Sequence, residues 1–478
     1  MEAIDAKWFS RAALIVLVVT SLRLLVLGLS KADVFVDEAQ YWLWGQSLDF
    51  GYYSKPPLIA WVIRAVTDLA GSDSALWIRF PAPIFHGATA LILGALAARV
   101  FNGRAAIWTT VSYVTLPIVA LGSLVISTDT IMAPFLAAGL LFYWKMLGSR
   151  RTVHAILTGT MIGAAFMSKY AGVYFFLGAI LSALLMPSHR PTLKNLIALL
   201  ASFAAVISPN VIWNLSHSLT TVEHTIDNVG WVREDAPGAS LNLGAFLEFA
   251  STQFAVMGPV LLVALVLATP RADRKLLPLL LFSLPIILLV CFQALMSYAY
   301  GNWAFAAYIA GTVAAVGWLA QKSTRWLWVS LAINSIFTVA VPAIAISGDQ
   351  INVDGKPILL RNMGREEFSR QVLLLSEQVG PSAIVASNRD ILADLFLTGR
   401  DQDIPIKSIP PKGRPRNYYE QNFALEEDTS GLVLLVSSDK VIECNGETYL
   451  PTQVLDTVGT AYEGAEFAAF TLDPVCVK

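Results

Sequence analysis

The sequence predicts an α-helical polytopic membrane protein with about eleven transmembrane helices and a small C-terminal α/β domain. Of its 478 residues, 55% are hydrophobic and only 14% are charged, and the mean hydropathy is +0.60. Soluble proteins carry about 25% charged residues, so this composition indicates a chain built for lipid. A net charge of -2 excludes the broad basic surface typical of nucleic-acid-binding proteins, and we expect no nucleic-acid partner.

The predicted spans follow from apolar runs in the first three quarters of the chain. A hydrocarbon core about 30 Å thick needs about 20 apolar residues per helix. No small-residue cleavage site follows the first run, so we expect an anchor and not a removable signal peptide. The runs cover residues 12–29, 80–98, 105–123, 130–147, 155–167, 172–186, 195–213, 246–268, 276–296, 303–320 and 326–346.

Lysine and arginine placement predicts the orientation. Alternate short loops read "ARVFNGR", "KMLGSRR", "SHRPTLK", "TPRADRK" and "QKSTR", and the connections between them contain few basic residues. Because basic loops favour the cytoplasmic side, we expect a cytoplasmic N-terminus and two long external loops, 31–79 and 214–245. Residues 1–347 then form a transmembrane domain.

Beyond residue 347 the composition changes toward that of a soluble domain. The segments "PSAIVAS", "GLVLLVSS" and "EFAAFTL" predict short strands, and "REEFSRQVLLLSEQVG" predicts a helix. We therefore expect residues 348–478 to form an α/β domain on the external side of the membrane. Cys444 and Cys476 both lie in it, and an oxidising compartment would permit a disulfide, although the sequence does not decide whether they pair.

Two adjacent carboxylates, Asp37 and Glu38, follow the first span by about seven residues. The next residues, "AQYWLWGQ", predict an amphipathic helix in the membrane interface, which would hold both carboxylates at headgroup depth. We interpret Asp37 and Glu38 as candidate catalytic residues. The alternative is that an external loop needs solvating charges.

Three cations on the external side are candidates for binding a phosphate: Lys55 in "YYSKPPL", Lys169 in "FMSKYAG" and Arg233 in the second long loop. Arginine and lysine are the usual phosphate ligands. Each residue also has a simpler explanation. Lys55 lies in a long external loop, and such loops escape the bias of basic residues toward the cytoplasmic side. Lys169 could extend its ammonium group to the membrane interface. Arg233 could be a solvated loop charge.

Six further residues are candidates for contacting substrate. Asp129 could instead stabilise a helix start capped by Ser127 or Thr128. His217 and His224 could bind a metal ion together with Glu223, but the spacing of the three residues does not form a metal-ligand motif. Aromatic residues at helix ends also suit an interfacial belt. The six candidates are Tyr53, Asp129, His217, His224, Tyr298 and Trp303.

These motifs together resemble the GT-C membrane glycosyltransferases, in the branch of the dolichyl-phosphate-mannose protein mannosyltransferases and the lipid A aminoarabinose and galacturonic acid transferases. The matching stretches are "VDEAQYWLW", "YYSKPPL", "STDTIMAP", "FMSKYAG" and "PNVIWNLSHSL". The resemblance covers about residues 11–347.

The resemblance implies an inverting enzyme of the bacterial inner membrane. It would move a sugar from a polyprenyl-phosphate-sugar donor to lipid A, the core of the lipopolysaccharide, another glycan or a protein, with Asp37 as general base. No other cofactor and no metal is expected. In the aminoarabinose transferases an acidic residue precedes the lysine, whereas this chain has Ser54, which puts a metal site there in doubt.

Two other classes of function remain open at this stage. The hydropathy also allows a lipid or sugar transporter or flippase, although that class favours broken helices at the membrane midplane. A scaffold that only displays the C-terminal domain is the third possibility.

Overall fold

The computed structural model describes residues 7–229 and 241–477, and its contacts divide the chain into two compact units. The helical unit comprises Met1–Gly28, Asp49–Ser72 and Leu76–Pro342, and the α/β unit comprises Leu29–Leu48, Asp73–Ala75 and Ala343–Lys478. The α/β unit therefore contains part of the first long loop that we had assigned to the transmembrane domain.

The helical unit is built from long apolar helices joined by short turns. Its helices are α1 (Lys7–Leu29), α3 (Leu58–Ala70), α4 (Ala75–Arg79), α5 (Pro81–Val100), α6 (Gly103–Val114), α7 (Pro117–Gly122), α8 (Thr128–Ser149), α9 (Thr152–Ser168), α10 (Tyr174–Leu185), α11 (Leu193–Ser216), α12 (Thr220–Val229), α13 (Leu243–Met257), α14 (Pro259–Ala268), α15 (Leu276–Leu281), α16 (Leu284–Met296), α17 (Phe305–Lys322) and most of α18 (Thr324–Ser347). Single 3-10 turns are η1 (Tyr170–Val173), η2 (Pro187–His189), η3 (Thr269–Arg271) and η4 (Gly301–Ala304).

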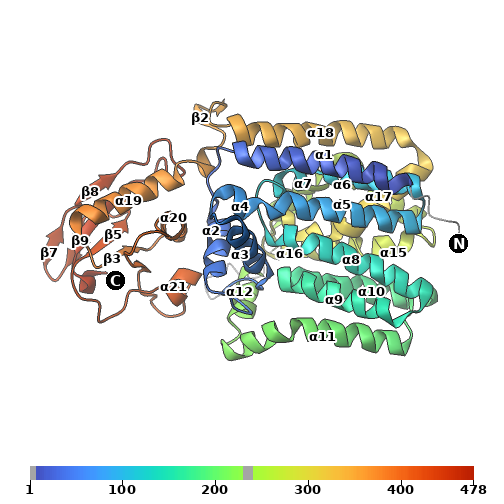
Figure 1. Ribbon diagram of the computed structural model, residues 1–478, viewed down its shortest axis with the longest axis horizontal. Coiled ribbons are helices and arrows are strands. Elements are labelled where there is room, and N and C mark those ends of the chain that lie inside the picture. Colours follow the sequence, from blue (N-terminus) through green and yellow to red (C-terminus); the bar gives the residue numbers. More distant parts are fainter. Residues whose placement is uncertain (1–6, 230–240, 478) are drawn as a thin grey trace. The chain divides into compact units, whose positions relative to one another are not determined.

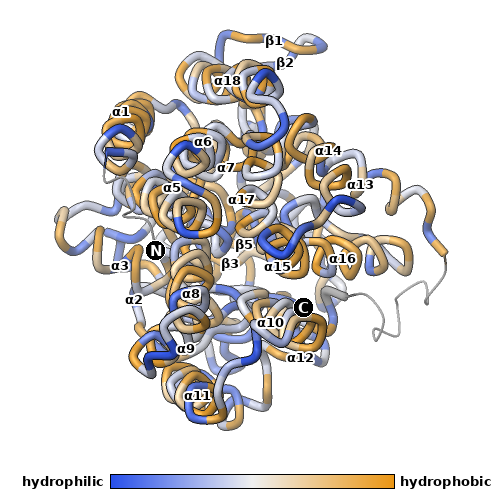
Figure 2. The backbone as a smooth tube through the Cα atoms, turned by 90° about the vertical axis from the view of Figure 1, so that its right-hand side faces the viewer, coloured by the Kyte–Doolittle hydropathy of each residue, from blue (hydrophilic) through white to orange (hydrophobic). Residues whose placement is uncertain are grey.

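Neighbouring helices of this unit pack along their lengths. α11, α9, α8 and α5 lie side by side in that order (Figure 1). Small residues allow the close approach: a Cβ atom at Gly159 of α9 would lie 2.1 Å from the Leu199 carbonyl oxygen of α11, so only glycine fits there. Hydrophobic residues dominate the helices, and hydrophilic residues gather in the turns (Figure 2).

The predicted count of eleven spans is not confirmed, although helices occupy all eleven apolar runs. Among the described residues, seven helices are long and apolar enough to cross a membrane, and a bent pair makes an eighth. That pair, α13 and α14, turns by 107° where Gly258 adopts a φ of +82° before Pro259. Pro117 starts α7 and so divides another run. α9 and α10 have 17 and 12 residues and are short for a span.

The α/β unit contains the predicted strands and the predicted helix. Its helices are α2 (Val36–Gln46), α19 (Arg365–Val379), α20 (Arg389–Thr398) and α21 (Tyr418–Asn422), with the 3-10 turns η5 (Leu360–Asn362) and η6 (Pro474–Cys476). Its strands are β1 (Asn352–Val353), β2 (Lys356–Pro357), β3 (Ala383–Ala386), β4 (Ile406–Ser408), β5 (Val433–Ser437), β6 (Ile442–Cys444), β7 (Glu447–Tyr449), β8 (Gln453–Leu455) and β9 (Phe467–Leu472).

A five-stranded mixed sheet forms the core of this unit, in the order β4-β3-β5-β9-β8. β3 pairs in parallel with β4 and β5, and β9 runs antiparallel to β5 and β8. Every residue of β3 and β5 is buried, as expected for central strands covered on both faces. The predicted strands in "PSAIVAS", "GLVLLVSS" and "EFAAFTL" are confirmed as β3, β5 and β9, and the predicted helix as α19.

Backbone contacts explain why the segment after α1 belongs to the α/β unit. The amide of Lys31 donates to the carbonyl of Ala345 at 2.8 Å, and the amide of Asp33 donates to the carbonyl of Asn362 at 2.8 Å. The Asp33 carboxylate also accepts from the Arg365 amide at 2.8 Å. These bonds dock the residues before α2 onto the end of α18 and the start of α19.

A disulfide closes the C-terminal end of the α/β unit. Cys444 of β6 and Cys476 of η6 are bonded, with their Cα atoms 5.5 Å apart. The bond joins the β6–β7 hairpin to the last residues described. The sequence had left this pairing open.

A buried ion pair connects α19 to α20. Arg365 Nη1 lies 3.1 Å from Asp394 Oδ2, and the Tyr462 hydroxyl donates to the same oxygen at 2.5 Å. The Arg365 and Asp394 side chains are 5% and 3% exposed. Burial raises the pKa of Asp394 to about 7, although Arg365 opposes the shift, because loss of water disfavours the charged carboxylate.

The raised pKa of Asp394 predicts a pH-dependent stability. An unfolded aspartate titrates near pKa 3.9, so between about pH 4 and the folded pKa of about 7 the folded state binds more protons and stability falls as the pH rises. We expect the melting temperature of the wild type, relative to Asp394→Asn, to fall as the pH rises from about 5 to about 8. Scanning fluorimetry of both purified proteins measures this difference, and a constant difference contradicts the prediction.

Candidate functional site

A cavity of about 470 Å³ lies within the helical unit. It forms where the loop before α3, the α9–α10 junction and parts of α12, α16 and η4 meet. One part of its lining carries two lysines, and another is apolar or aromatic. The lining residues are Ser54, Lys55, Pro56, Lys169, Tyr170, Ala171, Val173, Tyr174, Thr225, Leu289, Val290, Phe292, Gln293 and Trp303.

Lys169 is held at this cavity by an ion pair. Its Nζ lies 2.8 Å from both carboxylate oxygens of Asp129, and Asn302 Nδ2 donates to Asp129 Oδ2 at 2.8 Å. The side chains of Lys169 and Asp129 are 18% and 9% exposed. A carboxylate this far from water needs such donors, so Asp129 fixes the position of Lys169.

Local backbone features place both ions. Lys169 ends α9 with an extended backbone, at φ -156° and ψ 134°, which turns the chain into η1. Asp129 lies in the first turn of α8, where the Ser127 hydroxyl accepts from the Thr130 amide at 3.3 Å. The alternative for Asp129 was that it stabilises a helix start capped by Ser127 or Thr128. Ser127 does cap this helix, and Asp129 in addition pairs with Lys169.

Lys55 reaches the cavity from a tight turn. The Tyr52 amide donates to the Lys55 carbonyl at 3.3 Å, and the Thr221 hydroxyl donates to the Tyr52 carbonyl at 2.7 Å. Pro56 and Pro57 follow and restrict the backbone before α3. The cavity lining thus has two lysines, and Asp129 compensates one of them.

Of the six residues predicted to contact substrate, Trp303 lines the cavity and Asp129 pairs with a residue that does. The other four are not among its lining residues. The Tyr53 ring packs against His224 with centroids 5.0 Å apart, and His217 stacks on Trp213 at 4.2 Å. Tyr298 packs against Trp303 at 5.9 Å. Arg233 lies outside the described residues.

The two predicted catalytic carboxylates belong to the α/β unit and have different surroundings. Glu38 is fully buried, and its carboxylate accepts from the Phe35 amide at 2.9 Å, which fixes the first turn of α2. Asp37 is 51% exposed and its Oδ1 lies 2.5 Å from Arg389 Nη2. Arg389 also donates from Nε to Gln40 at 3.1 Å.

Arg389 and Asn302 were missed by the sequence analysis. Arg389 follows β3 in "ASNRD", where nothing in the sequence connects it to α2. Burial lowers the pKa of Arg389, but the Asp37 carboxylate outweighs burial and the net shift is upward. Asn302 lies in "SYAYGNW", where the predicted site residues are the aromatic residues Tyr298 and Trp303.

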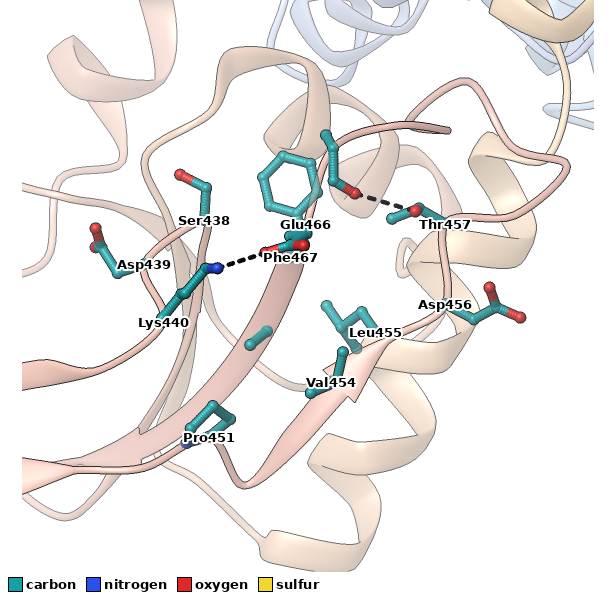
Figure 3. Close-up of a pocket in the computed structure, with 12 residues that line it drawn as sticks. Ser438, Asp439, Lys440, Pro451, Val454, Leu455, Asp456, Thr457, Glu466 and Phe467 are labelled. Carbon is teal, nitrogen blue, oxygen red and sulfur yellow. Dashed lines mark hydrogen bonds and ion pairs between the residues drawn. The ribbon is translucent and has the colours of Figure 1, made fainter.

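A second cavity, of about 580 Å³, lies in the α/β unit beside β8 and the start of β9 (Figure 3). Leu455 and Phe467 line it together with charged residues of the rim, and Lys440 lies 3.5 Å from Glu466. No candidate residue from the sequence analysis lines this cavity. Among the described residues, no group of three or more His, Cys, Asp or Glu side chains could hold a metal ion.

Comparison with known proteins places the chain in a family. Residues 54–213 match the model of the dolichyl-phosphate-mannose-protein mannosyltransferase family. The lipid A galacturonosyltransferase RgtD of Rhizobium johnstonii is 40% identical over 470 residues, which cover 97% of this chain and 98% of RgtD. The chain belongs to the GT-C glycosyltransferases. The predicted family is confirmed, and this GT-C protein is an enzyme that transfers sugar.

Solved structures support the GT-C fold. ArnT from Cupriavidus metallidurans in its apo state superimposes with a TM-score of 0.63 and 12% identity, over 90% of this chain and 92% of ArnT. The same protein bound to undecaprenyl phosphate gives a TM-score of 0.64, also at 12% identity, over 99% of both chains. The likeness covers the helical and the α/β units of this GT-C enzyme.

Proposed function

We propose that this enzyme transfers a sugar of the galacturonic acid class from a polyprenyl-phosphate carrier to lipid A. The observation that carries the proposal is the cavity of the helical unit, which combines two lysines with an apolar lining. A polyprenyl phosphate has the same two chemical parts, an anionic head and a hydrocarbon chain.

The charges of the cavity suit the donor phosphate. Lys55 and Lys169 supply two cations, and Asp129 compensates one of them. These two ammonium groups attract the phosphate of the donor and stabilise the second negative charge that develops as the sugar departs. Leu289, Val290 and Phe292 offer an apolar surface for the first part of the lipid chain.

Asp37 is our proposed general base. It takes the proton from an acceptor hydroxyl, whose oxygen then forms a bond to the anomeric carbon. The bond between that carbon and the phosphate oxygen breaks, its electron pair stays with the polyprenyl phosphate, and the anomeric configuration inverts. Glu38 supports this role by fixing the first turn of α2, and Trp303 is our candidate for contact with the sugar.

The acceptor and the sugar are proposed from the likeness to RgtD, a lipid A galacturonosyltransferase. A protein acceptor is the alternative, since the matching family model carries the name of a protein mannosyltransferase. We place the enzyme in the bacterial inner membrane, with a cytoplasmic N-terminus and the α/β unit in the periplasm. The basic loops and the Cys444–Cys476 disulfide support this orientation.

Reconstituted enzyme tests the proposal directly. The purified protein in lipid vesicles receives polyprenyl-phosphate-linked galacturonic acid with lipid A, and mass spectrometry of the lipid A detects one added hexuronic acid. Parallel reactions supply the nucleotide-linked sugar as donor, or membrane protein as acceptor. Transfer from the nucleotide donor alone, or to protein alone, overturns the proposal.

A further inference from the structure

We propose that Arg389 is a positioning residue for Asp37, so that the C-terminal segment orients the catalytic base. The inference rests on the proposed function, because it gives Arg389 a catalytic effect only if Asp37 accepts the proton. Both residues belong to the α/β unit. They lie 352 positions apart in the chain.

The guanidinium of Arg389 contacts two side chains on one face of α2. Nη2 donates to Asp37 Oδ1 at 2.5 Å, and Nε donates to Gln40 Oε1 at 3.1 Å. Asp37 and Gln40 are three positions apart and therefore neighbours on the helix surface. Because the guanidinium is rigid and planar, the bond to Gln40 orients the group that holds Asp37 Oδ1.

This arrangement leaves the second carboxylate oxygen available. Within the described residues, no hydrogen bond reaches Asp37 Oδ2, and the side chain is 51% exposed. One oxygen is held by the arginine and the other can accept the proton of a hydroxyl. Arg389 can therefore orient the Asp37 carboxylate while the second oxygen stays available to accept a proton.

Arg389 is itself rigidly placed. It is the first residue of α20, directly after Asn388, whose side chain accepts from the Asp390 amide at 2.8 Å. The strand before it, β3, is buried throughout. A cation at a helix N-terminus is disfavoured by the helix dipole, so Arg389 does not stabilise α20 from this position. It does supply a charged hydrogen bond to Asp37.

A structural role alone explains the pair less well. The Arg389 side chain is 37% exposed and that of Asp37 is 51% exposed, and ion pairs with this much solvent contact contribute little to stability. Removing Arg389 should therefore change the reaction more than the fold. This difference makes the inference testable.

A double-mutant cycle on the full-length enzyme tests it. We expect Arg389→Gln to lower kcat about 10- to 100-fold, as a misplaced catalytic group does, with the KM for the polyprenyl-phosphate donor and the melting temperature unchanged. Arg389→Lys should recover part of the loss. In an Asp37→Asn background, Arg389→Gln should add no further loss, because the group that it orients is already inactive.

The matched control is Arg370→Gln, which removes an exposed arginine paired with Glu366 on α19 and should leave kcat unchanged. If Asp37→Asn keeps full transfer, the proposed function fails. If Asp37→Asn loses transfer while Arg389→Gln keeps the wild-type kcat, only the role of Arg389 fails. Equal losses from Arg389→Gln in both backgrounds, or a fall in melting temperature, indicate a structural role and overturn the inference.

Discussion

Asp37→Asn is expected to lower the rate of sugar transfer about 100- to 10,000-fold, the range that general-base catalysis contributes. Asparagine keeps the size of the side chain but cannot take the proton of the acceptor hydroxyl. Donor binding depends on other residues, so the KM for the polyprenyl-phosphate donor should change little. Initial rates with purified protein in vesicles measure the effect.

The control for this prediction is Asp428→Asn, which removes an exposed carboxylate from the same unit and should leave the rate unchanged. Equal abundance and equal melting temperature of the three proteins exclude a folding defect. An Asp37→Asn enzyme with the wild-type rate would falsify the assignment of Asp37 as the base.

Lys169→Met is expected to reduce both stability and transfer. It leaves the Asp129 carboxylate, 9% exposed, without its cation, and removing one partner of a buried ion pair costs about 3–5 kcal/mol. Loss of a charged hydrogen bond to the donor phosphate costs about 1.5–3 kcal/mol, which corresponds to roughly a 10- to 150-fold loss in kcat/KM.

A double variant separates these two effects. Asp129→Asn combined with Lys169→Met removes both charges, so the melting temperature should return close to that of the wild type, while transfer stays low because the donor phosphate still lacks the hydrogen bond from the Lys169 ammonium. Lys145→Met, in the last turns of α8, is the matched control. Recovery of transfer in the double variant would show that Lys169 serves only to neutralise Asp129.

Much of the fold could be predicted because the relevant signals are local. Apolar runs of about 20 residues indicate spans, and helices do occupy these runs. The count of spans could not be predicted as well, because a bend depends on one or two residues: Gly258 and Pro259 turn the chain by 107°, and Pro117 starts a new helix.

The candidate site was harder to predict because its contacts join distant segments. Lys169 and Asp129 were recognised separately, but their pairing depends on how α8 packs against α9. Glu38 looked equivalent to Asp37 in the sequence, yet one carboxylate caps a helix and the other pairs with Arg389. The local sequence does not indicate which of two adjacent acidic residues, Asp37 or Glu38, is buried.

The discontinuous composition of the α/β unit has a consequence for biogenesis. Asp33 bonds with Arg365, and Asp37 with Arg389, across 332 and 352 positions of sequence. The segment synthesised first therefore lacks these partners until Arg365 and Arg389 have been made. A chain released before Arg389 has been made would present α2 without this contact.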